Sequence, residues 1–248
     1  MSEYKFPTEI VELPSKGHFY VSGHPLSNGK IEIKYMTAKE EDILSSDNLI
    51  RQGTVIDKLL ESLIVDKSIN IGDIITGDKN AIMVASRVLA YGKDYNFEYA
   101  GVEQTVDLTK LQNKKVDYSK FPQGKNEFEF KLPNSKRLIK FKLANGHDEA
   151  AIDVEVKALK KINSNISSEL TTRFKKTILS VDGNSDIQFI NNFVDNEFLS
   201  VDSLALRKYI TKITPDIDMT TIIKDEDGEE IEVTIPVTLR FFWPTANI

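Results

Sequence analysis

Cysteine is absent from the 248-residue chain. Its absence excludes disulfide bridges, thiolate zinc sites and cysteine nucleophiles, although it does not define a cellular compartment. Histidine is also scarce, with His18, His24 and His147 as the complete set. No two of them have the helical spacing that would place their side chains on one face, and no H-E-x-x-H motif is present. The sequence therefore predicts no metal site and no bound cofactor.

Long apolar runs and an excess of positive charge are lacking as well. No apolar run approaches the roughly 18 residues that a membrane-spanning helix needs, and the first twenty residues contain Glu3, Lys5, Glu9 and Glu12 in place of the apolar segment of a signal peptide. We therefore expect no membrane span. The formal net charge is -6, which argues against a nucleic-acid backbone as the main ligand.

Hydrophobic periodicity predicts the fold class. Helical periodicity is found over residues 37–44, 55–64, 78–92, 145–162, 187–194 and 202–213. Alternation typical of strands predicts hairpins over residues 95–108, 128–143 and 219–243. We expect an α+β fold, mainly antiparallel sheet built from hairpins with several amphipathic helices packed on it. The chain is interpreted as a single domain over residues 1–248, with residues 37–92 as a candidate helix-rich subdomain.

Several local signals refine this outline. Thr37 and Glu40 have the spacing of a capping box and predict the start of a helix. Asp47 to Gly53 is expected to be a loop, and Asp78 is expected to cap the following helix. Asn28-Gly29 before an alternating segment suggests a tight hairpin turn. Leu170 to Val181 is compatible with a strand or with a longer two-sided segment.

The search for catalytic motifs gives weak candidates. His147-Asp148 resembles a fragment of the His-Asp pair of metal-dependent phosphohydrolases, but Asp148 also suits the first turn of the helix that follows. The glycines of Gly72 to Gly77 are spaced as in a phosphate loop, but Asp78 occupies the position where that motif needs lysine. The acidic run from Asp225 to Glu230 favours a solvated hairpin turn over a calcium site. We therefore predict no catalytic residues.

Positive charge is concentrated in two places. Lys157, Lys160 and Lys161 form one group, and a second group consists of Arg173, Lys175 and Lys176. Because the chain as a whole is acidic, these groups are interpreted as solvated faces or as a patch for a protein partner.

The segment from Ile231 to Trp243 is the most apolar near the C-terminus and alternates like a strand with one buried face. Pro236 cannot donate a ladder hydrogen bond, so the segment is predicted to be an edge strand or a broken strand. We consider a protein interface that would include Pro236, Phe241, Phe242 and Trp243. The alternative is that Phe241 and Trp243 fill the core of the chain itself.

The turn from Leu13 to Tyr20 has apolar ends, and Pro14 and Gly17 suit a tight turn. One interpretation is a docking loop, which adds Leu13 and Phe19 to the candidate interface. The other is a surface turn that Leu13 and Phe19 hold in place.

Five segments form an ordered set along the chain: Leu13 to Tyr20, Tyr35 to Leu44, Gly53 to Ile64, the helix from Gly77-Asp78 to Tyr91-Gly92, and Ile235-Pro236 with Phe241-Phe242-Trp243-Pro244. Taken in this order, they resemble the baseplate hub protein family of T4-like contractile-tailed bacteriophages. The resemblance extends over nearly the whole chain, although each segment alone is unspecific.

The resemblance implies a non-enzymatic role in the central baseplate and supplies no catalytic residues. It implies other phage hub and tail proteins as partners, and a location in the tail baseplate of the virion, with the host cytoplasm as the site of assembly. A structural hub subunit and a hub assembly factor that leaves before completion both remain open, as does self-association into a homo-oligomer. A metal-dependent hydrolase that uses His147 and Asp148 is the alternative from another class.

Overall fold

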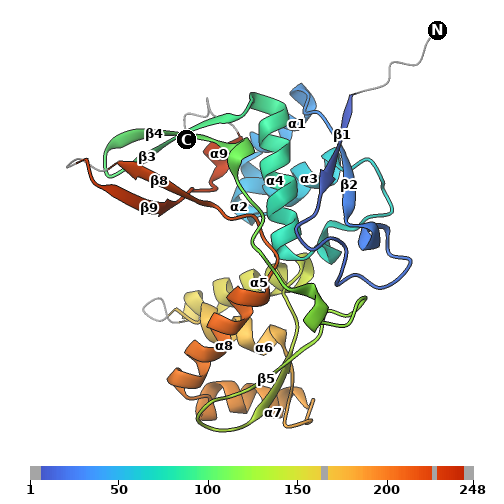
Figure 1. Cartoon of the computed structure of the whole chain (residues 1–248), viewed down its shortest axis with the longest axis vertical. Coiled ribbons are helices and arrows are strands. Elements are labelled where there is room, and N and C mark those ends of the chain that lie inside the picture. The colour runs from blue at the N-terminus through green and yellow to red at the C-terminus, as the bar shows by residue number, and fades with distance from the viewer. Residues whose placement is uncertain (1–6, 163–166, 225–227, 243–248) are drawn as a thin grey trace.

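The chain has an α+β fold with two lobes (Figure 1). The computed structural model describes residues 7–162, 167–224 and 228–242. One lobe is discontinuous in sequence and consists of residues 7–112 and 217–242. The other, which we call the inserted lobe, consists of residues 114–216. The two lobes lie one above the other along the longest axis of the molecule, so the chain passes between them twice.

The helices and strands alternate irregularly along the chain. The helices are α1 (Ala38–Leu44), α2 (Asp47–Gln52), α3 (Val55–Leu63), α4 (Thr76–Tyr91), α5 (Gly146–Ile162), α6 (Glu169–Thr177), α7 (Ile187–Asn192), α8 (Ser200–Ile213) and α9 (Leu239–Phe242). The strands are β1 (Thr8–Glu12), β2 (Lys30–Lys34), β3 (Asp94–Tyr99), β4 (Val102–Asp107), β5 (Phe128–Lys131), β6 (Leu138–Phe141), β7 (Ile178–Val181), β8 (Thr220–Lys224) and β9 (Glu230–Thr234).

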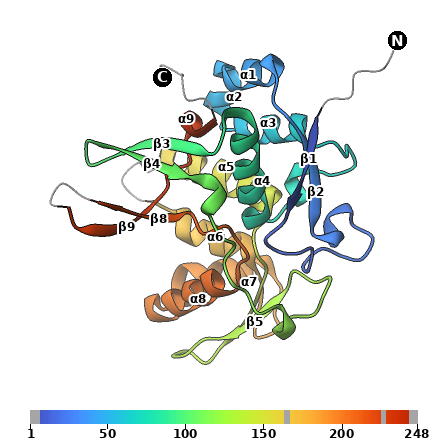
Figure 2. The same cartoon turned by 45° about the horizontal axis from the view of Figure 1, so that its top comes forward.

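The strands form small separate antiparallel sheets, in agreement with the predicted hairpins. β1 pairs with β2, β3 with β4, β8 with β9, and β5, β6 and β7 form a three-stranded sheet in that order. The hairpins β3–β4 and β8–β9 project from the same side of the discontinuous lobe in two views of the molecule (Figures 1 and 2). Each sheet is therefore too small to bury a face alone and depends on helices for its core.

Two clusters of buried side chains make up the core. The first extends through both lobes, from Ile33 and Ile82 in the discontinuous lobe to Phe141 and Leu206 in the inserted lobe. The second lies within the discontinuous lobe, between helices α1–α4 and the hairpins β3–β4 and β8–β9. Helix α3 contributes to both, with Leu60 in the first cluster and Leu59 in the second. Residues 37–92 thus contact two cores and have no separate one.

Two predicted segments have a different local structure. Asp47 to Gly53, expected to be a loop, contains helix α2, which ends where Gly53 adopts φ 76°. Leu170 to Val181, expected to be a strand or a two-sided segment, is divided between α6 and β7. In the second segment, basic residues at 173, 175 and 176 alternate with the buried positions of helix α6, which are Thr172, Phe174 and Thr177, and so they obscure its helical pattern in the sequence.

The predicted tight turn at Asn28-Gly29 is also different. Residues 13–29 connect β1 to β2, and Gly29 ends a short 3₁₀ turn within that connection. In helix α5, Leu159 and Ile162 near the C-terminal end are exposed, although helix α6 packs against α5.

The terminal strand is shorter than the alternating pattern predicts. β9 ends at Thr234, and residues 239–242 form the short helix α9. The amide of Ile235 still donates to the carbonyl of Met219 at 2.8 Å, but Pro236 has no amide hydrogen with which to continue the ladder. The strand therefore ends before Pro236 and is followed by a helix. Because β9 pairs only with β8 among the described residues, it is an edge strand, as one of the two sequence interpretations stated.

The two chain crossings between the lobes are bonded to each other and form a neck. Asn113 and Ile217 form an antiparallel bridge, and the amide of Lys114 donates to the carbonyl of Asp216 at 2.8 Å. The carboxylate of Asp216 also accepts a hydrogen bond from Asn80 of α4 at 2.9 Å. The inserted lobe therefore begins and ends at neighbouring points, directly beside helix α4.

Candidate functional site

The first turn of helix α4 is fixed by the loop from Leu13 to Tyr20. Asp78, fully buried, accepts hydrogen bonds on its carboxylate from the backbone amide of Ser15 at 2.9 Å and from the Ser15 hydroxyl at 2.6 Å. The Tyr20 hydroxyl donates to the same carboxylate at 2.8 Å and accepts from the amide of Ile75 at 3.2 Å. Asp78 therefore joins the loop to the helix and does not act as the predicted N-cap, a position that Ile75 occupies.

Burial governs the ionisation of this cluster. Removal from water raises the pKa of Asp78, and the hydrogen bonds from Ser15 and Tyr20 offset part of that rise. Burial and the neighbouring Asp78 carboxylate raise the pKa of Tyr20 far above its usual value. Tyr20 consequently keeps its proton and remains a hydrogen-bond donor to Asp78.

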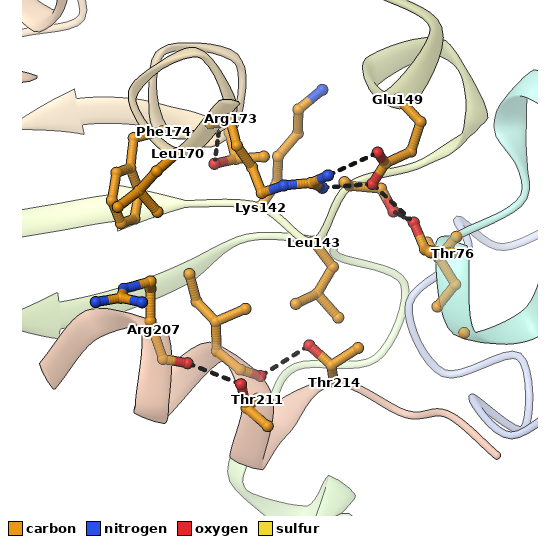
Figure 3. A pocket seen from close by; sticks show the side chains of 15 residues that line it. Thr76, Lys142, Leu143, Glu149, Leu170, Arg173, Phe174, Arg207, Thr211 and Thr214 are labelled. Carbon is orange, nitrogen blue, oxygen red and sulfur yellow. Dashed lines mark hydrogen bonds and ion pairs between the residues drawn. The ribbon is translucent and has the colours of Figure 1, made fainter. Parts of the chain in front are cut away.

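A pocket lies where the first turn of α4 meets the inserted lobe (Figure 3). Its volume is about 390 Å³, which is in the range of sites that hold a small molecule or a large side chain. Helices α5, α6 and α8 and the segment after β6 provide its walls. The apolar lining includes Ile75, Leu143, Leu170, Phe174 and Ile210.

The close approach of α4 to the end of α8 depends on a glycine. A Cβ atom at Gly77 would lie 1.7 Å from the carbonyl oxygen of Pro215, a distance that no side chain can adopt. Only glycine permits this contact, and so the sequence Gly77-Asp78, which resembles part of a phosphate loop, has a packing role here.

One side of the pocket carries a fixed polar group. Arg173 donates two hydrogen bonds to Glu149, at 2.6 and 3.0 Å, and this bidentate pairing raises the pKa of the Arg173 guanidinium further. The Thr76 hydroxyl lies 3.3 Å from the Glu149 carboxylate and 3.1 Å from the carbonyl of Ala144. The three side chains link α4, α5 and α6 around the pocket (Figure 3).

The opposite side of the pocket is formed by α8 and has polar groups that are available to bind a ligand. Thr211 and Thr214 donate their hydroxyl protons to the carbonyls of Arg207 and Ile210, at 3.0 and 2.7 Å. Their oxygens can therefore accept further hydrogen bonds but have no proton left to donate. Arg207 has no carboxylate partner among the residues that the structure describes. The pocket therefore suits a ligand in which an apolar group stands next to a negatively charged group.

His147 and Asp148, the candidate metal pair, have structural partners. Asp148 accepts a hydrogen bond from Lys142 at 2.7 Å and exchanges backbone-to-side-chain hydrogen bonds with Asn145, the residue before helix α5. His147 lies 3.2 Å from Asp73. Within residues 7–162, 167–224 and 228–242, no group of three or more His, Cys, Asp or Glu side chains could hold a metal ion.

The residues predicted to form an interface are mostly interior. Leu13 and Phe19 belong to the first core cluster, and Phe241 and Phe242 to the second. Phe241 packs edge-on against Tyr95 with ring centroids 4.9 Å apart. Because all four side chains are buried, they have a core role. For Leu13, Phe19 and Phe241 this agrees with the structural alternative, and for Phe242 it differs from the predicted interface.

The other two predicted interface residues differ from these four. Pro236 is partly exposed, and its carbonyl accepts a hydrogen bond from the Tyr95 hydroxyl at 3.0 Å. Trp243, the remaining predicted residue, lies outside the described residues.

The second predicted basic group does not form a free patch. Arg173 pairs with Glu149, Lys175 with Asp195 and Lys176 with Glu155. The sequence pattern therefore singled out Arg173 as part of a surface group. It gave no indication of Arg207 or of the pocket. The signal for the pocket was distributed over segments that are distant in the sequence, which no local pattern brings together.

Comparison of the chain with protein-family models, with curated proteins and with solved structures gave no match. Within the part of the chain that the structure describes, no helix combines the length and the apolar composition needed to cross a membrane.

Proposed function

We propose that the chain is a non-enzymatic assembly protein that binds a partner protein through the pocket between α4, α6 and α8. The observation that carries this proposal is the combination of apolar walls with the unpaired Arg207. An apolar side chain of a partner would occupy the space between Leu143, Phe174 and Ile210, and a nearby carboxylate would pair with Arg207.

The assembly that we propose is the baseplate hub of a contractile-tailed bacteriophage, with the chain as a structural component. The ordered set of segments that resembles the T4-like hub family supports this proposal. The partners would then be other hub and tail proteins, met in the host cytoplasm during assembly and retained in the tail baseplate of the virion.

The amount of the chain in purified tails tests whether it is a structural component. Mass spectrometry of tails from infected cells is expected to find it in a fixed ratio to the other baseplate proteins. If the chain forms a complex with hub proteins in the lysate but is missing from finished tails, the assembly-factor alternative replaces the structural one. Absence from both would overturn the proposal.

Two substitutions test the pocket itself. Arg207→Glu reverses the unpaired charge, and Leu170→Asp places a charge at the apolar mouth. Each is expected to reduce copurification of hub proteins from infected cells by at least about tenfold, because each removes one element of the complementarity.

Lys115→Glu and Val65→Asp are the matched controls, since they make the same changes in charge at exposed positions outside the pocket. Both are expected to retain wild-type copurification. Equal effects of the pocket and control substitutions would show that the pocket is not the binding site.

A further inference from the structure

The tip of the β3–β4 hairpin is a narrow element with both apolar and acidic side chains. Tyr99 and Val102 face each other across the strands beside the turn and remain 41% and 38% exposed. The next pair along the ribbon is Glu98 and Glu103, which point to the opposite face because side chains alternate along a strand. The hairpin projects away from the body of the molecule (Figures 1 and 2).

Two features of this tip cost free energy in a single copy of the chain that has no partner. Like charges placed directly opposite each other across a strand pair repel, and neither Glu98 nor Glu103 has a cationic partner among the described residues. The turn also places Ala100 at φ 49°, followed by Gly101 at φ 83°, and a non-glycine residue in this region costs about 1–2 kcal/mol. The tip therefore carries a negative charge that is not compensated within the described residues.

Helix α8 presents a face of the opposite character. Val201, Leu204, Lys208 and Lys212 follow the spacing that places side chains on one side of a helix, and all four are exposed. The apolar pair stands in the first turns and the cationic pair near the C-terminal end. No ion-pair partner of Lys208 or Lys212 is found in residues 7–162, 167–224 and 228–242.

The two lobes also carry net charges of opposite sign, like the hairpin tip and the face of α8. Residues 114–216 contain 18 Lys/Arg and 14 Asp/Glu, a net charge of +4, whereas the rest of the chain contains 14 and 24, a net charge of -10. The acidic hairpin tip belongs to the negative lobe and helix α8 to the positive one. Contact between unlike lobes of two copies is therefore favoured over contact between like lobes.

We propose that the β3–β4 tip of one copy docks end-on against the outward face of α8 in a second copy. Tyr99 and Val102 cover Val201 and Leu204, while Glu98 and Glu103 pair with Lys208 and Lys212. The two halves of the α8 face are about 11 Å apart at 1.5 Å per residue. The apolar and acidic pairs of the tip are also set apart, because they leave the ribbon on opposite faces.

This contact joins unlike surfaces, so repetition produces a ring or a chain of copies, and a reciprocal pair of contacts produces a dimer. It uses the outward face of α8 and leaves the pocket, which lies beside Arg207 and Ile210, available for another protein. Self-association and binding of the hub partner can therefore be tested separately.

The test is a reciprocal charge reversal followed by analytical ultracentrifugation of the full chain. The wild type is expected to associate at about 0.05 M salt and to dissociate at about 0.5 M, where screening acts over a few ångströms. Glu98→Lys/Glu103→Lys and, separately, Lys208→Glu/Lys212→Glu are each expected to weaken association by at least about tenfold.

Mixing the two double variants is the decisive measurement. The basic tip of the Glu98→Lys/Glu103→Lys variant complements the acidic helix face of the Lys208→Glu/Lys212→Glu variant. The unchanged tip of the second variant complements the unchanged helix face of the first, as in the wild type. The mixture is therefore expected to associate, although neither variant does so alone. Lys115→Glu/Lys125→Glu, which changes the net charge by the same amount as the helix variant, is expected to associate normally. A monomeric wild type at low salt, or a mixture that fails to associate, would overturn the proposal.

Discussion

At the scale of single residues, the most consequential group is the buried carboxylate of Asp78. Three hydrogen bonds from Ser15 and Tyr20 replace the water that it loses. Sequence reasoning identified Asp78 and expected it at a helix cap, because aspartate in a first turn most often has that role. Its partners lie about sixty residues earlier in the chain, and a local sequence pattern cannot reveal contacts over such a separation.

The first residue-scale prediction concerns Tyr20. Tyr20→Phe removes the donor to Asp78 and the acceptor for the amide of Ile75, so two buried polar groups lose a partner. We expect the free energy of unfolding to fall by about 1–3 kcal/mol, measured by urea denaturation. Tyr99→Phe, at an exposed ring, is the control and should leave stability unchanged. Equal stability of all three proteins would contradict the assigned network.

At the scale of elements, Glu40 joins three neighbouring segments. Its carboxylate accepts hydrogen bonds from Lys34 of β2 at 2.7 Å, from Ser62 of α3 at 2.6 Å and from both the amide and the hydroxyl of Thr37 at the start of α1. Burial alone would raise the pKa of Glu40, but these hydrogen bonds outweigh it and lower the pKa to about 2.

The second prediction follows from that lowered pKa. A carboxyl group whose pKa is lower in the folded state stabilises the protein above its unfolded pKa of about 4.3, and the contribution disappears as the pH falls towards 2. Glu40→Gln is therefore expected to lose about 2 kcal/mol at pH 7 and little at pH 2.5. Urea midpoints across this range measure the difference. A constant difference between the two proteins at every pH would contradict the role of the charge.

The elements that sequence patterns predicted best are those with complete local signals. The Thr37–Glu40 spacing gave the start of α1, and Gly92 gave the end of α4. The predictions failed where the deciding interaction is distant or the local pattern is ambiguous: α6 has charged residues between its buried positions, and the alternating pattern continues through residues 239–242, which form helix α9. The pocket could not be predicted, because Gly77, Leu143, Phe174 and Ile210 come from four separate segments.

At the scale of the whole molecule, the discontinuous lobe is completed by the end of the chain. Phe241 and Phe242 are fully buried in the same cluster as Leu44, Leu59 and Leu63, although they follow those residues by about 180 to 200 positions in the sequence. The neck brings residues 216–218 back to residues 112–114, which makes this late contribution possible.

The third prediction tests that closure. Phe241→Ala and Phe242→Ala should each destabilise the protein by about 3–5 kcal/mol, because each leaves a cavity in the second core cluster. Thermal and urea unfolding followed by circular dichroism measure the loss. Val237→Ala, at a side chain that is 41% exposed, is the control and should cost little. If the phenylalanine variants remain as stable as this control, the two rings are not part of the core.

The position of Phe241 and Phe242 also has a consequence for biosynthesis. Helices α1 to α4 leave the ribosome first, yet the apolar face that they turn to the second core cluster is covered only in part, by Tyr95, Phe97 and Leu108, until residues 223–242 have been made. At about 5–20 residues per second, the interval from Gly92 to Phe242 lasts on the order of ten to thirty seconds. The inserted lobe is synthesised in full during that interval, so a nascent chain carries an open hydrophobic surface that a premature stop codon would leave permanently exposed.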